Sequence, residues 1–461
     1  MEPTNIRFGG GVADTVLHPA VAIALCITIL LVWSLPRKYV IIPWILNVFL
    51  VPLGQVLVVG GIHFTVYRLV VLAGLVRVVT MKRSPGTPRL AGGFTGIDGA
   101  FSLFAVLTFV TFALQWMEAQ ALIRGLGTLL DALGGFYVLR CLIRDKEGVK
   151  RAVTVLAVVA IILGACMVAE QITDVNMFWA LGAGPAEAAV RGGKVRSTGS
   201  FEVYITAGVF GATLVPLLVW LWSGAKARLR ALMGIVGATV MVITSTSSTP
   251  LLAYGAGVGG LCLWPLRRHM RGVRWCLALL VVGAELCMKA PVWALIARVD
   301  LTGSSSGYHR YMLVDQCVRH FAEWWLIGTK HYNEWGYDMW DLSNQYVACA
   351  VTGGLATLVA FLGIISRSFG QLGRARKRAG NDRKRDWYLW CIGAALLSHV
   401  VAYFGVAYFD QMQAAWYALL AIICAAAPVA SRAAASRGKK ALATGDQSES
   451  GEASMVPAAG A

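Results

Sequence analysis

Residues 149–172 read VKRAVTVLAVVAIILGACMVAEQI, and no charged side chain interrupts the stretch between Ala152 and Ala169. A helix needs about 20 apolar residues to cross the roughly 30 Å hydrocarbon layer of a bilayer. A helix suits this layer because it satisfies its own backbone hydrogen bonds where water is absent. The stretch therefore predicts one membrane-spanning helix.

The same apolar pattern recurs along most of the chain, and by this length criterion we expect about thirteen spanning segments. They are 17–35, 39–58, 62–79, 100–116, 122–143, 149–172, 203–222, 229–246, 250–266, 273–294, 345–366, 387–406 and 414–428. The sequence thus predicts an all-α polytopic membrane protein with about 12–13 transmembrane helices. Its transmembrane domain would occupy residues 1–432, followed by a disordered cytoplasmic tail at 433–461 that is rich in Ala, Gly, Ser and Glu.

The composition excludes several classes of protein. Charged residues make up 14% of the chain, against about 25% in ordinary soluble domains. The net charge of +17 comes from cations in short loops between apolar segments, so it reports membrane topology, and we expect no nucleic-acid partner. The 10 cysteines include no CxxC pair, and we therefore expect no metal site, no disulfide framework and no cofactor.

Basic loops alternate with loops that carry few cations. The basic loops are 37–38, 82–89, 144–151, 226–230, 267–274, 374–385 and 432–440. Because cytoplasmic loops carry an excess of Lys and Arg, these loops are predicted to face the cytoplasm. The intervening loops, including long ones at about 173–202 and 298–344, would face the periplasm. This places the N-terminus in the periplasm and the C-terminus in the cytoplasm of a bacterial inner-membrane protein.

Several ionisable side chains fall inside apolar segments, where an ionised group costs about 2.5 to 3.5 kcal/mol on insertion scales. We interpret Arg68 and Asp131 as a buried structural pair. Arg140 and Glu170 lie near predicted helix ends, from which their charged groups would reach the membrane interface.

The long loop at 298–344 is dense in polar and aromatic residues, and between 303 and 344 it reads GSSSGYHRYMLVDQCVRHFAEWWLIGTKHYNEWGYDMWDLSN. Aromatic faces stack on sugars, imidazoles and carboxylates accept protons, and arginines hold phosphates. These are the groups that a carbohydrate-transfer site requires. The alternative is an interfacial amphipathic helix at 308–325 with a belt of aromatic residues.

Three short motifs resemble the O-antigen ligase and polymerase superfamily. The first is Ser343-Asn344, nine residues, then Gly354-Leu355-Ala356-Thr357, at the junction of the long loop with the next helix. The second is Arg196-Ser197-Thr198-Gly199-Ser200-Phe201, which is similar to the family's Arg-x-x-Gly-x-Phe element. The third is His309-Arg310 followed by Leu326-Ile327-Gly328, which looks like the family's Arg before a Pro-Leu-x-Gly turn, although the proline is absent.

The resemblance implies a GT-C-like fold and a metal-independent, inverting transfer or polymerisation of undecaprenyl-pyrophosphate-linked glycans at the periplasmic face. The partners would be the lipid-linked oligosaccharide, a glycan or lipid acceptor, and membrane lipids. Ser343 stands where the ligases carry a histidine. The predicted base is therefore Asp341, with His309 and His331 as alternatives; Asp341 as a helix N-cap is the structural reading.

The predicted substrate-binding residues are Arg196, Arg310, Lys330, Trp335 and Asn344. A fixed guanidinium fork suits pyrophosphate, whereas the alternative for Arg196 is contact with lipid headgroups. Two other functions compete with the enzyme: a transporter or flippase, and a non-catalytic component of polysaccharide assembly. Transporters generally carry inverted repeats, and no such pairing is evident in this sequence.

Overall fold

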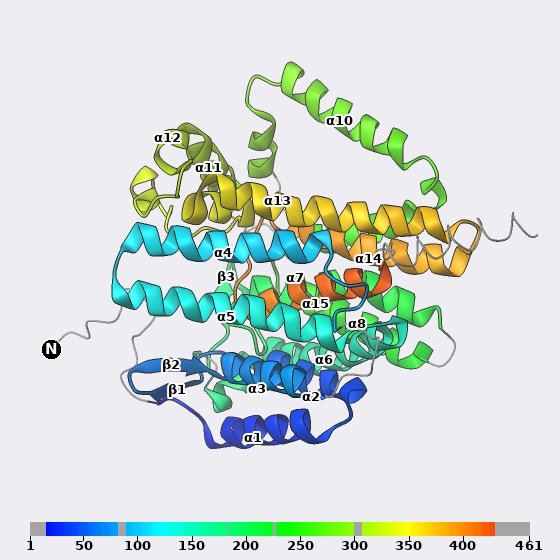
Figure 1. The fold of residues 1–461 in the computed structure, drawn as a ribbon. Helices are drawn as coiled ribbons and strands as arrows, with labels where there is room; N and C mark the ends of the chain where they lie inside the picture. Colours follow the sequence, from blue (N-terminus) through cyan, green and yellow to red (C-terminus); the bar gives the residue numbers. More distant parts are fainter. Residues whose placement is uncertain (1–14, 82–88, 183, 225–226, 299–306, 429–461) are drawn as a thin grey trace, which may run out of the picture.

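The computed structural model describes residues 15–81, 89–182, 184–224, 227–298 and 307–428. Within these ranges the chain is nearly all α, and its long helices lie side by side in a bundle (Figure 1). The α-helices are α1 (Pro19–Ser34), α2 (Arg37–Leu50), α3 (Val66–Thr80), α4 (Gly96–Trp116), α5 (Ala119–Leu142), α6 (Lys146–Thr173), α7 (Tyr204–Trp222), α8 (Arg228–Thr244), α9 (Ser248–Cys262), α10 (Met270–Cys287), α11 (Gly307–Arg319), α12 (Phe321–Trp324), α13 (Gln345–Ala379), α14 (Arg383–Ala402) and α15 (Asp410–Ala426). Short 3-10 helices are η2 (Met177–Leu181), η4 (Trp264–Leu266), η5 (Val292–Arg298) and η6 (Tyr332–Trp335).

Two antiparallel hairpins modify the predicted all-α fold. Strand β1 (Val56–Val59) pairs with β2 (Ile62–Thr65), and β3 (Ala189–Arg191) pairs with β4 (Lys194–Arg196). The first hairpin occupies the ends of two segments that were predicted to be helices, 39–58 and 62–79. Its apolar residues include several Val and Ile, which suit a strand as well as a buried helix.

The helices confirm a multi-pass membrane protein. Five of the described helices, α4, α5, α6, α7 and α13, are long and apolar enough to cross a bilayer, and the number rises to 6 if α10 and η5, bent by 90°, form one span. The predicted total of about 12–13 transmembrane helices is therefore not reached when helices are counted by length and apolar composition. Other apolar helices such as α1, with 16 residues, are shorter than a full span. The predicted tail at 433–461 lies outside the described residues.

The two predicted groups of loops lie at opposite ends of the bundle. Figure 1 shows the β1–β2 hairpin with α11 and α12 at one end, which we call the loop end. The connection from α13 to α14 and the start of α10 lie at the other, which we call the basic end because it carries the cations of 267–274 and 374–385. These loops therefore lie at the ends expected for them, while the membrane side of each end stays a prediction.

Small residues allow close contact between helices in the middle of the bundle. A Cβ atom at Gly164 in α6 would lie 2.8 Å from the carbonyl oxygen of Gly237 in α8. Membrane helices associate through such contacts because lipid supplies no hydrophobic driving force between them. Both glycines are therefore required for the close contact between α6 and α8.

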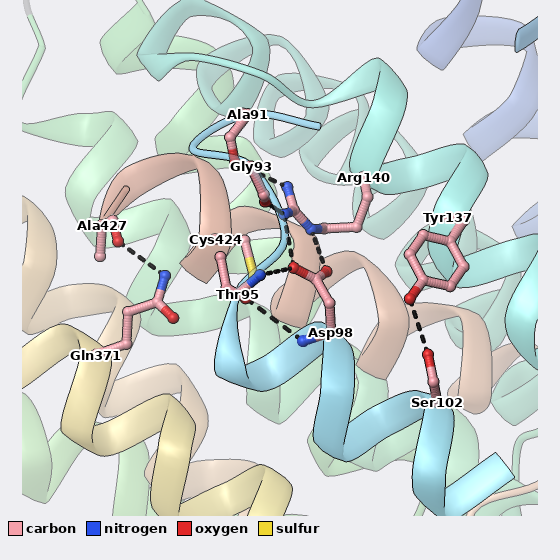
Figure 2. A network of polar contacts seen from close by, with 10 residues as sticks. All are labelled: Ala91, Gly93, Thr95, Asp98, Ser102, Tyr137, Arg140, Gln371, Cys424 and Ala427. Carbon is pink, nitrogen blue, oxygen red and sulfur yellow. Dashed lines mark hydrogen bonds and ion pairs between the residues drawn. The ribbon is translucent and has the colours of Figure 1, made fainter. Parts of the chain in front are cut away.

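A fully buried ion pair fastens α4 to α5 at the basic end. Arg140 Nε donates to Asp98 Oδ1 at 2.7 Å and Nη2 donates to Oδ2 at 3.0 Å, and both side chains have no exposed surface. The guanidinium also donates to the carbonyls of Ala91 and Gly93, and Asp98 accepts from the backbone of Thr95 in a capping box (Figure 2). The expectation that Arg140 reaches the membrane interface is therefore wrong, because Asp98 and two carbonyls neutralise and satisfy it inside the bundle.

The predicted pair of Arg68 and Asp131 is confirmed. Arg68 in α3 and Asp131 in α5 form an ion pair with 2.7 Å between Nη2 and Oδ2, and each side chain is less than one-fifth exposed. Arg68 also donates to the carbonyl of His63 at the end of the β1–β2 hairpin. This pair therefore ties the hairpin to the membrane helices.

We expect Asp98→Asn to destabilise the protein by about 3–5 kcal/mol, because it leaves the Arg140 charge buried without a counter-charge. The double variant Asp98→Asn/Arg140→Met removes both charges and should lose less stability than the single variant. Unfolding of the purified protein in detergent by denaturant measures both losses. An equal or greater loss in the double variant would contradict this account.

Candidate functional site

The predicted long loop at 298–344 is folded over most of its length. It contains α11, α12 and η6, so the helix expected at 308–325 ends at Arg319 and resumes at Phe321. Cys317 and Trp324 from the loop form a small core with Val347, Ala350 and Val351 of α13. The Trp324 indole donates to the carbonyl of Cys317 at 2.7 Å, which closes the turn between α11 and α12. The loop is thus docked on the first half of α13.

A break in α13 receives the turn that follows α12. Gly354 has φ 73°, a left-handed conformation that interrupts the helix. At this break Leu355 N donates to the Trp325 carbonyl at 2.9 Å, and Thr329 N donates to the Val351 carbonyl at 2.8 Å. A Cβ atom at Gly354 would lie 2.6 Å from the Leu326 carbonyl oxygen. Two of the motifs that carried the resemblance, Leu326–Gly328 and Gly354, therefore contact each other.

The second motif, Arg196–Phe201, forms a turn held by a buried acid. Glu170, 1% exposed near the end of α6, accepts from Thr198 N at 2.9 Å and Gly199 N at 3.0 Å. Gly199 has φ 59°, which a glycine adopts without strain. The prediction that Glu170 reaches the membrane interface is thus wrong, because its carboxylate is occupied by these two amides. Their hydrogen bonds fix the backbone that leads from Arg196 into α7.

Two buried guanidinium groups face this region from different elements. Arg196, at the end of β4, is 4% exposed; its Nη1 donates to Tyr204 Oη at 2.5 Å, and its Cζ lies 4.6 Å from the Tyr204 ring centre. Arg310, in the first turn of α11, is 5% exposed, and its Nε is buried with no hydrogen-bond partner among the described residues. The sequence separation of the two arginines shows that tertiary structure brings them together.

The charges of Arg196, Arg310 and Asp341 lie close enough to influence one another. Burial lowers the pKa of Arg310, the nearby Asp341 carboxylate and the Tyr204 hydroxyl oppose this shift, and Arg191 and Arg196 add to it. Within the described ranges no carboxylate lies within ion-pair distance of Arg310. The region therefore holds more positive than negative charge in a low-dielectric setting, which favours an anionic ligand.

A histidine and a carboxylate border the arginines. His309 Nε2 lies 3.0 Å from the Asp341 carbonyl oxygen and 3.9 Å from its Oδ2. The Asp341 side chain is 53% exposed, so its carboxylate is open to a ligand, whereas the His309 side chain is 17% exposed. Next to them the Ser343 hydroxyl oxygen is buried without a partner in the described part of the chain. An exposed carboxylate oriented by an imidazole can accept a proton from a hydroxyl group.

The structure thus brings together four of the predicted site residues: Arg196, Arg310, His309 and Asp341. Three others make different contacts. His331 Nδ1 lies 2.9 Å from Glu334 Oε1 on an exposed turn. Lys330 Nζ lies 5.2 Å from the ring centre of Trp116, and the Trp335 indole donates to Glu323 Oε2 at 2.9 Å.

Asn344 has a structural contact that the sequence did not predict. Its Oδ1 accepts from Tyr346 N at 3.0 Å and Val347 N at 3.2 Å, so Asn344 is the N-cap of α13. The N-cap reading of Asp341 is therefore wrong. Asn344 Nδ2 also donates to the Phe404 carbonyl at 3.4 Å, and the residue is 1% exposed. Its proposed contact with substrate would therefore have to use the one remaining amide proton.

Sequence reasoning missed Tyr204 altogether. This tyrosine begins α7 and was read only as part of an apolar segment. No local sequence pattern predicts its contact with Arg196, because the turn at Thr198–Ser200 that brings the two together depends on Glu170 of α6. The role of Glu170 did have a signal, because it was the single acid at the end of a long apolar helix.

No protein-family model and no curated protein matches this chain. The functional argument therefore rests on the residues and their geometry.

We expect Gly354→Ala to destabilise the protein by about 1–3 kcal/mol, since alanine is strained at φ 73° and its methyl group would collide with the Leu326 carbonyl. The matched control is Gly363→Ala in the same helix, where a Cβ meets nothing within 4 Å. The control should be neutral or stabilising, as alanine favours a helix. Protease sensitivity of the α11–α12 region, measured beside unfolding, should rise only in Gly354→Ala.

Proposed function

We propose that this protein transfers or polymerises glycans carried on undecaprenyl pyrophosphate, at the periplasmic face of a bacterial inner membrane. In this proposal the loop end is the periplasmic end and the fold is of the GT-C type. The partners are the lipid-linked oligosaccharide, a glycan or lipid acceptor and the surrounding lipids. The observation that carries the proposal is the pair of buried guanidinium groups, Arg196 and Arg310, beside the exposed carboxylate of Asp341.

The arginines suit the leaving group of such a reaction. When the bond from the anomeric carbon to the pyrophosphate oxygen breaks, that oxygen takes the electron pair and becomes more negative. Guanidinium groups that are already desolvated and fixed stabilise this charge without reorganising. The Tyr204 hydroxyl, held by Arg196, can donate a further hydrogen bond to the same phosphate.

Asp341 is the proposed base. The acceptor hydroxyl attacks the anomeric carbon, its proton passes to the Asp341 carboxylate, and the lipid pyrophosphate leaves. A single displacement of this kind inverts the anomeric configuration. His309 positions the Asp341 backbone through the 3.0 Å contact of its Nε2 with the Asp341 carbonyl oxygen. His331 is not needed in this scheme.

An apolar cavity near the site supports a lipid-linked substrate. It has a volume of about 310 Å³ and lies between α4, α5 and the start of α13. Phe104, Phe109 and Phe112 line it on one side, and Gln345 in the first turn of α13 lines it on the other. Gln345 directly follows the Asp341–Asn344 segment, so the cavity borders the first turn of α13, next to the segment that holds the proposed base.

We expect Arg310→Gln and Asp341→Asn each to lower transfer by about 100-fold or more, because each removes a group that acts in the transition state. The assay gives the purified protein a lipid-pyrophosphate oligosaccharide and an acceptor, with and without a metal chelator, and resolves the glycan products by chromatography. Matched controls are Arg319→Gln, on the exposed side of α11, and Asp338→Asn.

The outcomes separate the candidate functions. Loss of product in Arg310→Gln and Asp341→Asn, with both controls active, supports the enzyme and its site. Full activity in both site variants would show that the site is elsewhere. Movement of a lipid or solute across vesicles without any new glycosidic bond would instead favour a transporter or flippase.

A further inference from the structure

A second cavity is lined by residues at the start of α10 and around the connection from α13 to α14, which lie at the basic end of the bundle (Figure 1). Its volume is about 800 Å³. One wall is the connection from α9 into α10, and the other is the end of α13 with the start of α14. The cations of the first wall are Arg267, Arg268, Arg271 and Arg274. The second wall supplies Arg376, Lys377 and Arg383.

A single carboxylate offsets these charges. Asp386 is the only acid that lines the cavity in the described part of the chain. It pairs with Arg376 at 2.6 Å and with Arg267 at 3.4 Å. The same two arginines lie over indole rings, Arg376 4.5 Å from Trp390 and Arg267 4.3 Å from Trp264. Two cations are therefore fixed as part of the wall.

The remaining cations have no such counter-charge. Among the described contacts no ion pair includes Arg268, Arg271, Arg274, Lys377 or Arg383. Like charges that converge on one cavity repel each other, and an anion with several oxygens between them would relieve this repulsion. The positive-inside bias explains why the loops are basic. It does not explain why cations from two separate loops line one cavity.

Helix α10 identifies the kind of anion. No residue of α10 is buried, and its leucines are largely open: Leu279 is 66% exposed, Leu280 67% and Leu286 82%. Figure 1 shows α10 standing away from α13 above the rest of the bundle. In a bilayer, acyl chains fill the space beside such a helix. The cationic cavity lies at the start of this helix, so the ligand there would have an acidic head and apolar chains.

We propose that the basic-end cavity is a binding site for an anionic phospholipid, with its phosphates between the two walls and its acyl chains along α10. Basic pockets between membrane helices bind such headgroups, including those of cardiolipin. The volume and the five cations without an ion pair fit a headgroup with two phosphates. The site stabilises α10 against the bundle, and it is independent of the proposed glycan chemistry.

The test is native mass spectrometry of the full-length protein in detergent, titrated separately with cardiolipin, phosphatidylglycerol, phosphatidylcholine and inorganic pyrophosphate. We expect cardiolipin to be retained most strongly and phosphatidylcholine least. Arg271→Gln/Lys377→Gln, with one change on each wall, should weaken cardiolipin binding about tenfold or more. The matched control is Arg228→Gln/Arg230→Gln, which removes two exposed cations of α8 outside the cavity.

Three results would overturn the proposal: equal retention of cardiolipin and phosphatidylcholine by the unmodified protein, an equal loss of binding in the control variant, or stronger binding of pyrophosphate than of any lipid. The last would indicate a soluble phosphate ligand. The charge-preserving variant Arg271→Lys/Lys377→Arg is the control for misfolding. It should bind cardiolipin to within about threefold of the unmodified protein. Loss of glycan transfer alone would leave these results unchanged, so the two proposals fail separately.

Discussion

A charged side chain among apolar helices is stable only when a partner offsets its loss of hydration, and this constraint organises the described structure. Asp98 and Arg140 satisfy it completely, with carbonyls and a capping box occupying the remaining donors and acceptors. Glu170 satisfies it with two backbone amides. Because each contact joins elements far apart in sequence, the same hydrogen bonds that neutralise these charges also fix the positions of the helices and of the turn after Arg196.

At two places the described residues do not supply a partner for every charge. These two places are the proposed binding sites. At the loop end, Arg310 is buried with an Nε that has no hydrogen-bond partner in the described part of the chain, and the side chain of nearby Asp341 is 53% exposed. At the basic end, cations from two loops face one cavity that a single carboxylate borders. Both sites hold excess positive charge, but their surroundings differ. The first is lined by a tyrosine and a histidine–carboxylate contact that suit group transfer, whereas the second lies beside exposed leucines that suit a lipid.

The break in α13 connects the membrane helices with the folded loop. A continuous helix would leave no free backbone groups for the turn after α12, whereas the left-handed Gly354 frees Leu355 N and the Val351 carbonyl to bond with it. The same helix begins at the Asn344 cap, three residues after Asp341. The position of the proposed base therefore depends on the contact between the break in α13 and the turn after α12. Gly354 therefore acts on the site through backbone geometry, without touching a ligand.

The sequence by itself determined that the chain crosses a membrane, because long runs of apolar residues have no other stable setting, and it located α6 and α7 to within a few residues. It also singled out Arg196, Arg310, His309 and Asp341 as residue types suited to phosphate and proton chemistry. Tertiary structure alone decided that these four lie together, that His331, Lys330 and Trp335 contact other groups, and that Asn344 is a cap. Local patterns could not decide this, since burial and pairing depend on residues more than 100 positions apart, as Arg196 and Arg310 show. For the same reason the β1–β2 hairpin was read as helix: its apolar residues fit either structure, and only its neighbours select one.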